Sequence, residues 1–172
     1  MSQLLPYTRN CFVCGAHNQH GLQLKFRQEG GEVRADFTPQ PHHAGFRGII
    51  HGGILSTVLD EAMFWAAAVA TGRFGLAVEL NVRFMKKVSV GDPLTVVAAF
   101  VADKGRLWES RAELRSADGS VVACATCKQM PMSAEEMQFA VGDFLADPAT
   151  TAAATLFASL KPDSNTRSAA AG

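Results

Sequence analysis

The segment GIIHGGILSTVLDEAMFWAAAVA, residues 48–70, constrains the fold of this chain more than any other stretch. Its apolar residues fall on nearly every side of a helical period, so we expect a helix over residues 53–71, ended by Gly72 and enclosed by other elements. Two adjacent carboxylates, Asp60 and Glu61, interrupt this apolar surface. Because a lone buried carboxylate is costly, both acids need a partner or a function.

The same segment is apolar enough to raise the possibility of a membrane span. It contains His51 and both acids, so we interpret it as a core helix and expect no membrane partner. Residues 1–10 lack the basic and apolar runs of a signal peptide. Together with four cysteines, this predicts reduced thiols and a cytoplasmic location.

The composition is that of an ordinary globular domain. The chain has 172 residues, 48% of them hydrophobic, which suits one domain with a sizeable core. Lys plus Arg and Asp plus Glu number 16 each, so no overall field would attract a polyanion. We therefore expect no nucleic-acid partner, and any anionic ligand must be held by local charge.

Six further segments alternate apolar and polar residues and are separated by turn formers, which is typical of strands. They span residues 22–28, 32–38, 76–88, 94–102, 107–116 and 120–130. In the segment 76–88, Val78, Leu80, Val82 and Phe84 are predicted to face one way. The order of two strands, a long helix and four strands predicts an α+β fold, with the helix lying on a curved antiparallel sheet.

The pattern changes after residue 132. Ser133 and Glu136 match a capping box, which predicts a helix, and a second short helix is expected after Pro148. The last residues are small and polar, as in a frayed tail. We therefore divide the chain into an N-terminal turn segment 1–20, a domain 21–132, and a C-terminal helical extension with a flexible tail 133–172.

The residues His51, Gly52 and Gly53 open the long helix and bear on the role of its acids. Glycines leave backbone N–H groups open to a ligand, and a helix start carries positive partial charge that suits an oxyanion. A carboxylate near such N–H groups is the minimum equipment for attack on an activated carbonyl. Alternatively, Asp60 and Glu61 are satisfied by loop backbone or by a salt bridge at a subunit interface. For His51 an orienting role is favoured over that of a general base.

The N-terminal segment carries four potential zinc ligands, Cys11, Cys14, His17 and His20. The two histidines follow the cysteines too closely for an ordinary zinc-finger loop. The other cysteines, Cys124 and Cys127, stand three apart in a predicted strand, so they point to opposite faces. We expect no metal, and interpret the segment as a tight turn with small buried thiols.

Four stretches together resemble the hotdog-fold acyl-CoA thioesterases, in the branch of the phenylacetate-pathway and 4-hydroxybenzoyl-CoA type enzymes. They are CFVCGAHNQHGLQLKF, GIIHGGILSTVLDEAM, NVRFMKKVSVGDPL and DKGRLWESRAELRSADGSVVACAT, so the resemblance covers about residues 10–131. It implies a hotdog fold, in which a five- to six-stranded curved antiparallel sheet wraps the long central helix. It also implies an active site between two subunits, and therefore a homodimer or a dimer of dimers.

The resemblance further implies hydrolysis of an acyl-CoA to a free acid and CoA, without a cofactor. In that reaction the backbone N–H of Gly52 polarises the thioester carbonyl. Asp60 is the nucleophile or general base, and Glu61 is the second choice. Family members often carry Asn or Gln at the position of Gly45, and Ser or Thr at the position of Ala77. With both polar groups missing, catalysis would lean on Asp60 and Gly52, with Glu61, Glu79 or Asn81 as further candidates.

Candidate substrate-binding residues lie on the helix, on the strand after it and in nearby loops. They are Gly53, Arg47, Phe46, Thr57, Asn81, Arg83, Lys86, Lys87, Lys104 and Arg106. The basic side chains would meet the CoA phosphates, and Phe46, Phe64 and Trp65 would line an acyl pocket. Ser56 and Thr57 are candidate hydrogen-bond partners of Asp60.

Two other functions fit the same fold. A non-catalytic acyl-CoA-binding or regulatory module is favoured by the missing polar groups at Gly45 and Ala77. A hydratase or dehydratase would use a different Asp/His or Glu/His arrangement, which the helix lacks.

Overall fold

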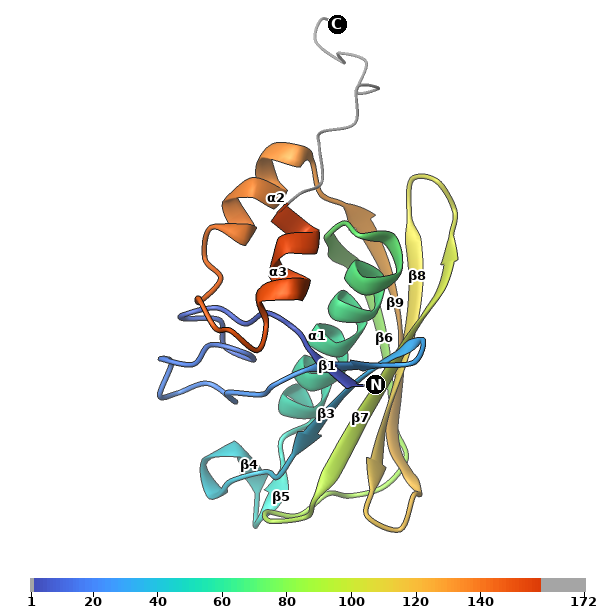
Figure 1. Ribbon diagram of the computed structural model, residues 1–172. Helices are drawn as coiled ribbons and strands as arrows, with labels where there is room; N and C mark the ends of the chain where they lie inside the picture. The colour runs from blue at the N-terminus through green and yellow to red at the C-terminus, as the bar shows by residue number, and fades with distance from the viewer. Residues whose placement is uncertain (1, 159–172) are drawn as a thin grey trace, which may run out of the picture.

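The computed structural model describes residues 2–158 and has a large antiparallel sheet with a long helix on one of its faces (Figure 1). The sheet has seven strands in the order β1-β2-β3-β7-β8-β9-β6. They are β1 (Ser2–Leu4), β2 (Arg27–Glu29), β3 (Glu32–Phe37), β7 (Leu94–Asp103), β8 (Trp108–Ser116), β9 (Val121–Pro131) and β6 (Gly75–Phe84). This confirms the predicted hotdog α+β fold, although the sheet has more strands than the five or six expected.

The sheet differs from the predicted one by an added strand and a shortened strand, and both lie in the N-terminal part of the chain. Ser2–Leu4 pairs antiparallel with β2, which adds an edge that no alternation in the sequence indicated. The predicted strand 22–28 reduces to Arg27–Glu29. Its first part does not join the sheet, because the N–H groups of Leu22 and Leu24 donate to the carbonyls of Phe12 and Val13.

The helix α1 (Gly52–Thr71) forms as the sequence predicts, and its two ends are fixed by local contacts. His51 is the N-cap, and Gly72 ends the helix in the left-handed conformation at φ 72°, where glycine carries no steric penalty. Its sheet-facing residues, among them Val58, Leu59 and Met63, are fully buried. Of the described helices, α1 alone is long and apolar enough to cross a membrane, yet half of that window is buried inside the fold.

A short hairpin leads into α1. It consists of a 3-10 turn (Pro41–His43), β4 (Ala44–Phe46) and β5 (Ile49–Ile50). The N–H of Ile50 donates to Val88 O, which ties the hairpin to the segment that follows β6. This end of the molecule therefore holds the start of α1 together with the end of β6.

Two helices follow the last strand, as predicted: α2 (Ala134–Val141) and α3 (Thr151–Ala158). The capping box forms, since Ser133 Oγ accepts from Glu136 N and the Glu136 carboxylate accepts from Ser133 N. Both helices lie beside the C-terminal half of α1 (Figure 1). Phe157 is 1% exposed and belongs to the same core as α1. The division of the chain at residues 20 and 132 remains a prediction, and the predicted tail lies outside the described residues.

The strand β6 is an edge strand with unusual exposure. Leu76, Val78 and Phe84 are each more than half exposed, and Leu80 is 37% exposed. A β-bulge between Ala77 and Glu79 interrupts its register with β9. Within one chain, the alternation of apolar and polar residues in β6 therefore does not produce one buried face and one exposed face.

Candidate active site

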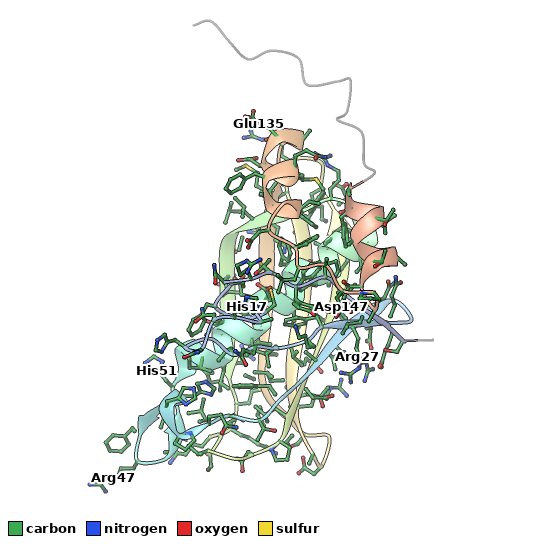
Figure 2. The ribbon with its side chains drawn as sticks, turned by 60° about the vertical axis from the view of Figure 1, so that its left-hand side comes forward. His17, Arg27, Arg47, His51, Glu135 and Asp147 are labelled. Carbon is green, nitrogen blue, oxygen red and sulfur yellow. The ribbon has the colours of Figure 1, made fainter. Side chains whose placement is uncertain are left out.

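The N-terminus of α1 offers one unsatisfied backbone donor. His51 Nδ1 accepts from Gly53 N at 2.9 Å, so the ring caps the helix and uses the N–H of Gly53. The N–H of Gly52 finds no acceptor within residues 2–158. His51 lies exposed at this end of the helix (Figure 2). The geometry therefore gives His51 an orienting contact and leaves Gly52 N–H free for a ligand.

Close packing explains two glycines around this donor. A Cβ on Gly52 would lie 3.1 Å from Phe84 Cζ, so the end of β6 contacts the start of α1. A Cβ on Gly45 would lie 3.0 Å from His51 Cδ2. A larger residue at position 45, such as Asn or Gln, would displace the His51 ring from its present place.

Asp60 lies two turns farther along α1, and its carboxylate has no hydrogen bond or ion pair within residues 2–158. Burial raises the pKa of Asp60 above its ordinary value. The expected partner Ser56 donates instead to Gly52 O at 3.0 Å, as hydroxyls within helices commonly do. The eight positions between Gly52 and Asp60 correspond to about 12 Å along the helix. One chain therefore cannot bring both groups to a single carbonyl.

Glu61 is in a different environment from its neighbour. Its Oε1 accepts from Trp65 Nε1 at 3.3 Å and from the Cys11 thiol at 3.9 Å. Burial, and secondarily the charge at Cys11, raises the pKa of Glu61 to about 7. Asp60 is thus the partner-free carboxylate, while Glu61 is held by contacts with its surroundings.

Both acids line a cavity of about 280 Å³ between the middle of α1, the N-terminal turn, the start of β6 and the segment after β9. The wall is largely aromatic and consists of Phe64, Trp65, Phe74 and Phe144. Ala77 lines it as well, without a hydroxyl group. Sequence reasoning proposed Phe64 and Trp65 but missed Phe74 and Phe144, because no local pattern connects residues that meet only after the C-terminal segment docks.

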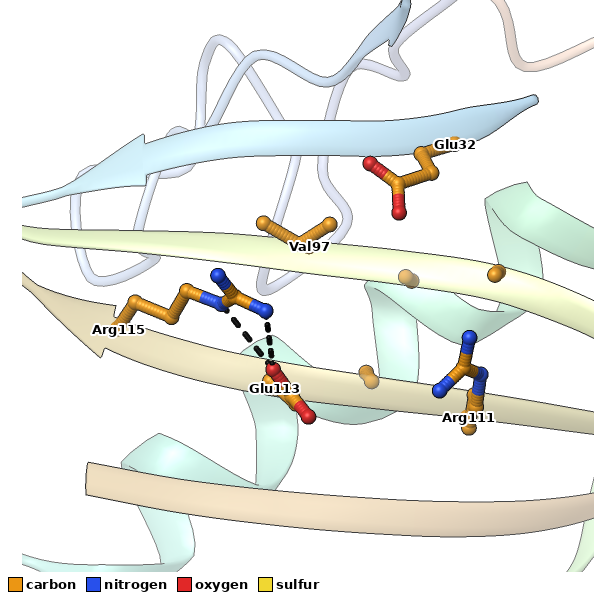
Figure 3. Close-up of a pocket in the computed structure, with 8 residues that line it drawn as sticks. Glu32, Val97, Arg111, Glu113 and Arg115 are labelled. Carbon is orange, nitrogen blue, oxygen red and sulfur yellow. Dashed lines mark hydrogen bonds and ion pairs between the residues drawn. The ribbon is translucent and has the colours of Figure 1, made fainter. Parts of the chain in front are cut away.

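The polar residues of β6 lie on the other face of the sheet. Asn81 pairs with Thr126, which pairs with Arg111, and paired residues share a face. Figure 3 shows Arg111 on that face, with α1 behind the sheet. Arg83 follows two positions after Asn81 and therefore also points away from the cavity. Glu79 binds Lys128 at 2.9 Å and accepts from Asn81. Neither Glu79 nor Asn81 can support Asp60 within one chain.

A shallow hollow on this outward face does not make a second binding site. It measures about 60 Å³ and lies among Glu32, Arg111, Glu113 and Arg115. Arg115 pairs with Glu113 of its own strand at 2.7 Å (Figure 3). The charges of the hollow are thus partly neutralised by one another.

The basic candidates divide between the two ends of the molecule. Arg47 projects from the β4–β5 hairpin near the start of α1 (Figure 2), and the exposed Lys86 and Lys87 follow β6 at the same end. Phe46 is 67% exposed beside Arg47 and lies outside the cavity. Arg106 and Lys104 stand in the β7–β8 hairpin, near the other end of α1 (Figure 1). Within one chain, the cationic groups near Gly52 are therefore those of Arg47, Lys86 and Lys87.

A sequence model of the thioesterase superfamily matches residues 47–123, which include the start of α1 and Asp60. Over these residues the chain is similar to the thioesterase superfamily. A comparison with curated proteins found no match.

Solved thioesterase structures share the fold. A thioesterase superfamily protein is 24% identical with a TM-score of 0.66, over 71% of this chain and 63% of that protein. The Escherichia coli PaaI protein, from the phenylacetic acid degradation operon, is 20% identical with a TM-score of 0.60, over 64% and 80%. A Streptococcus mutans protein bound to acetyl CoA is 20% identical with a TM-score of 0.56, over 60% and 83%. At these identities the likeness shows the hotdog fold.

Proposed function

We propose that this protein is a thioesterase superfamily member that hydrolyses an acyl-CoA to a free acid and CoA. The observation that carries the proposal is a pair of unsatisfied groups on one helix. The N–H of Gly52 has no acceptor, and the carboxylate of Asp60 has no donor, within residues 2–158. A free N–H at a helix start and a desolvated carboxylate are what addition to a thioester carbonyl requires.

A second copy of the chain would bring these two groups together. Phe84, at the end of β6, contacts Gly52, and Ala77, near the start of β6, lines the cavity of Asp60. The outer edge of β6 has no neighbouring strand in the described chain, and its apolar side chains are exposed. If two β6 edges pair antiparallel about a two-fold axis, the end of one strand meets the start of the other. Gly52 of one subunit then faces Asp60 of its partner, and a homodimer is the smallest active form.

The reaction at such a site follows from the groups present. The N–H of Gly52, with the partial charge of the helix start, stabilises the negative charge that develops on the thioester oxygen. Asp60 either adds to the carbonyl carbon or removes a proton from an attacking water. The carbon–sulfur bond then breaks and CoA leaves as its thiol. In the first case, water afterwards hydrolyses the mixed anhydride on Asp60.

Two further observations support an acyl-CoA as the substrate. The Streptococcus mutans protein of the same fold was crystallised with acetyl CoA. In this chain, Arg47, Lys86 and Lys87 are exposed at the end of the molecule where Gly52 lies. Their positive charge would suit the phosphates of CoA, while the aromatic cavity beside Asp60 would hold the acyl group.

A non-catalytic acyl-CoA-binding module is the second candidate, and the cavity wall favours it. At Ala77 the cavity presents a methyl group where family members often carry a hydroxyl. Catalysis would have to proceed without that hydrogen bond. Binding alone needs only the apolar wall and the basic end.

The first experiment is release of free thiol from aryl, short-chain and medium-chain acyl-CoAs by the wild type and Asp60→Asn. Turnover that falls at least about a hundredfold in the variant supports the proposed role, since removing one key group typically costs that much. Turnover that survives in Asp60→Asn contradicts the role of this carboxylate. Binding of every acyl-CoA without turnover by the wild type would replace the hydrolase with the binding module.

Mixing two inactive variants tests the shared site. In a mixed dimer of Asp60→Asn with Gly52→Pro, one site carries both defects and the other carries none. Statistical mixing should therefore restore about a quarter of the wild-type activity. If each subunit held a complete site of its own, mixing would restore nothing.

A further inference from the structure

The N-terminal turn places two thiols against the carboxylate of Glu61, at the wall of the cavity. Ligand atoms of Cys11, Cys14 and Glu61 all lie within 4.8 Å of one another. Within residues 2–158 this is the one group of three or more His, Cys, Asp or Glu side chains arranged closely enough to hold an ion. The three residues come from two segments about 50 positions apart, so only the fold brings them together.

The turn holds Cys11 in a geometry that favours a thiolate. Its Sγ accepts from the backbone N–H of Val13 at 3.3 Å and from that of Cys14 at 3.5 Å. Such N–H donors stabilise negative charge on sulfur. Gly15 closes the turn, since a Cβ there would lie 2.3 Å from Cys11 O. The chain therefore fixes this sulfur in place before any ligand arrives.

The histidines of the same segment do not join the cluster. His17 Nδ1 lies 3.3 Å from Arg9 Nη1, on the exposed side of the turn (Figure 2). His20 is also exposed, and its backbone N–H donates to Asn18 Oδ1. The sequence-based expectation of no metal considered Cys11 and Cys14 with these histidines. The structure instead provides Glu61 as the third ligand.

We propose that Cys11, Cys14 and Glu61 bind one thiophilic divalent cation, Zn²⁺ by preference, with its fourth position open to the cavity. Cys11 Sγ lies 3.9 Å from Glu61 Oε1. Around a tetrahedral zinc, with Zn–S about 2.3 Å and Zn–O about 2.0 Å, the two ligand atoms would stand about 3.5 Å apart. This pair would need to approach by a few tenths of an ångström, and the most separated pair, within 4.8 Å, by about 1 Å. Two thiolates select Zn²⁺ over Mg²⁺ or Ca²⁺, which prefer oxygen ligands.

Metal binding would also give the Glu61 carboxylate a cationic partner at the cavity wall. Glu61 is half-buried, with a weakly acidic indole N–H and a thiol as its donors. A divalent cation would displace the protons of the two thiols and offset two of the three negative charges of its ligands. The fourth position, occupied by water or by a substrate group, would face the same space as Asp60. The site needs no assumption about thioester hydrolysis.

The test is Co²⁺ and Zn²⁺ binding by the full chain, purified with a phosphine reductant and stripped with EDTA. Co²⁺ should give an intense sulfur-to-cobalt charge-transfer band that saturates at one ion per chain and is lost on adding Zn²⁺. The double variant Cys11→Ser/Cys14→Ser should lose the band. Glu61→Gln should weaken Zn²⁺ binding by about 10–100-fold or more, since even outer-shell partners contribute that much. The matched controls Cys124→Ser and Cys127→Ser should bind as the wild type does.

Circular dichroism of each EDTA-treated variant separates loss of the site from loss of the fold. If the folded, reduced wild type gives no charge-transfer band, the proposal is overturned. It is also overturned if the controls lose the band, or if Glu61→Gln binds Zn²⁺ unchanged, since the ion would then lie elsewhere. Rapid oxidation of Cys11 and Cys14 to a disulfide in a glutathione buffer that contains Zn²⁺ would replace the metal site with a redox pair.

Discussion

Phe157 offers a direct measure of how firmly the C-terminal helix α3 is joined to the rest of the core. Its ring is 1% exposed and lies 5.1 Å from the ring of Phe74 and 6.0 Å from that of Trp65, centroid to centroid. An eight-residue helix has little stability of its own, so packing holds it in place. Replacing a buried Phe by Ala typically costs about 3–5 kcal/mol. Because the surrounding aromatic rings are themselves buried and leave little room for collapse, we expect Phe157→Ala to cost about 4 kcal/mol.

Urea unfolding followed by circular dichroism, at one fixed protein concentration, measures this loss. The matched control is Phe139→Ala, which removes the same side chain from α2 at a position that is 88% exposed. That variant should change the free energy of unfolding by no more than about 0.5 kcal/mol. A loss below about 1 kcal/mol for Phe157→Ala would refute the reasoning, because α3 would then unfold separately from the sheet and α1.

Three further predictions concern the donor, the edge strand and the N-terminus. Gly52→Pro should lower thioester turnover about 10²–10³-fold relative to Gly52→Ala. Both variants add a Cβ near Phe84, but only proline, which helices accept at their first position, removes the backbone N–H. Equal rates for the two variants would exclude this N–H as the donor. If the proposed dimer forms through β6, Leu80→Lys should shift it to monomer in analytical ultracentrifugation, since it places charge on the exposed edge. An unchanged sedimentation coefficient would contradict an interface at β6. Tyr7→Phe should lower the melting temperature near neutral pH, because Tyr7 donates to Asp147 Oδ2 at 2.7 Å. That bond lowers the pKa of Asp147 and raises that of Tyr7. The stability that this bond contributes through Asp147 is present at pH values above the ordinary pKa of Asp. It is lost as the pH falls through the lowered pKa of Asp147. The stability that the bond contributes through the Tyr7 phenol is present below the ordinary Tyr pKa of 10.0. It is lost as the pH rises through the raised pKa of Tyr7. The difference in melting temperature should therefore shrink at both extremes, and a constant difference would indicate lost packing instead.

Sequence reasoning succeeded where the determining contacts are local. The helix α1, its stop at Gly72 and the capping box at Ser133 depend on residues within a few positions of one another. The long strands of the second half follow from alternation and turn residues. The separation of Cys124 from Cys127 likewise follows from the period of a strand, and Cys127 is the buried one.

The parts that failed depend on contacts between distant segments. Residues 22–26 alternate like a strand but bond to the N-terminal turn, because the N–H groups of Leu22 and Leu24 donate to carbonyls of that turn. Asn81 was a candidate to support Asp60. The pairing of β6 with β9 sets the direction of its side chain, which points away from α1. The meeting of Cys11 with Glu61 could not be read from spacing, since neither residue has a sequence pattern that refers to the other. The roles proposed for Gly52 and Asp60 remain predictions until activity is measured.

The aromatic wall contributed by Phe144 separates two properties of this protein. Phe144 belongs to the segment between α2 and α3, whereas the N–H of Gly52 and the carboxylate of Asp60 are fixed on α1. A substitution, insertion or deletion after β9 can therefore enlarge or shrink the space beside Asp60 without moving the helix cap. Under the proposed function, changes in the C-terminal segment would alter which acyl groups fit while Gly52 and Asp60 stay in place, so substrate range and chemistry could diverge independently.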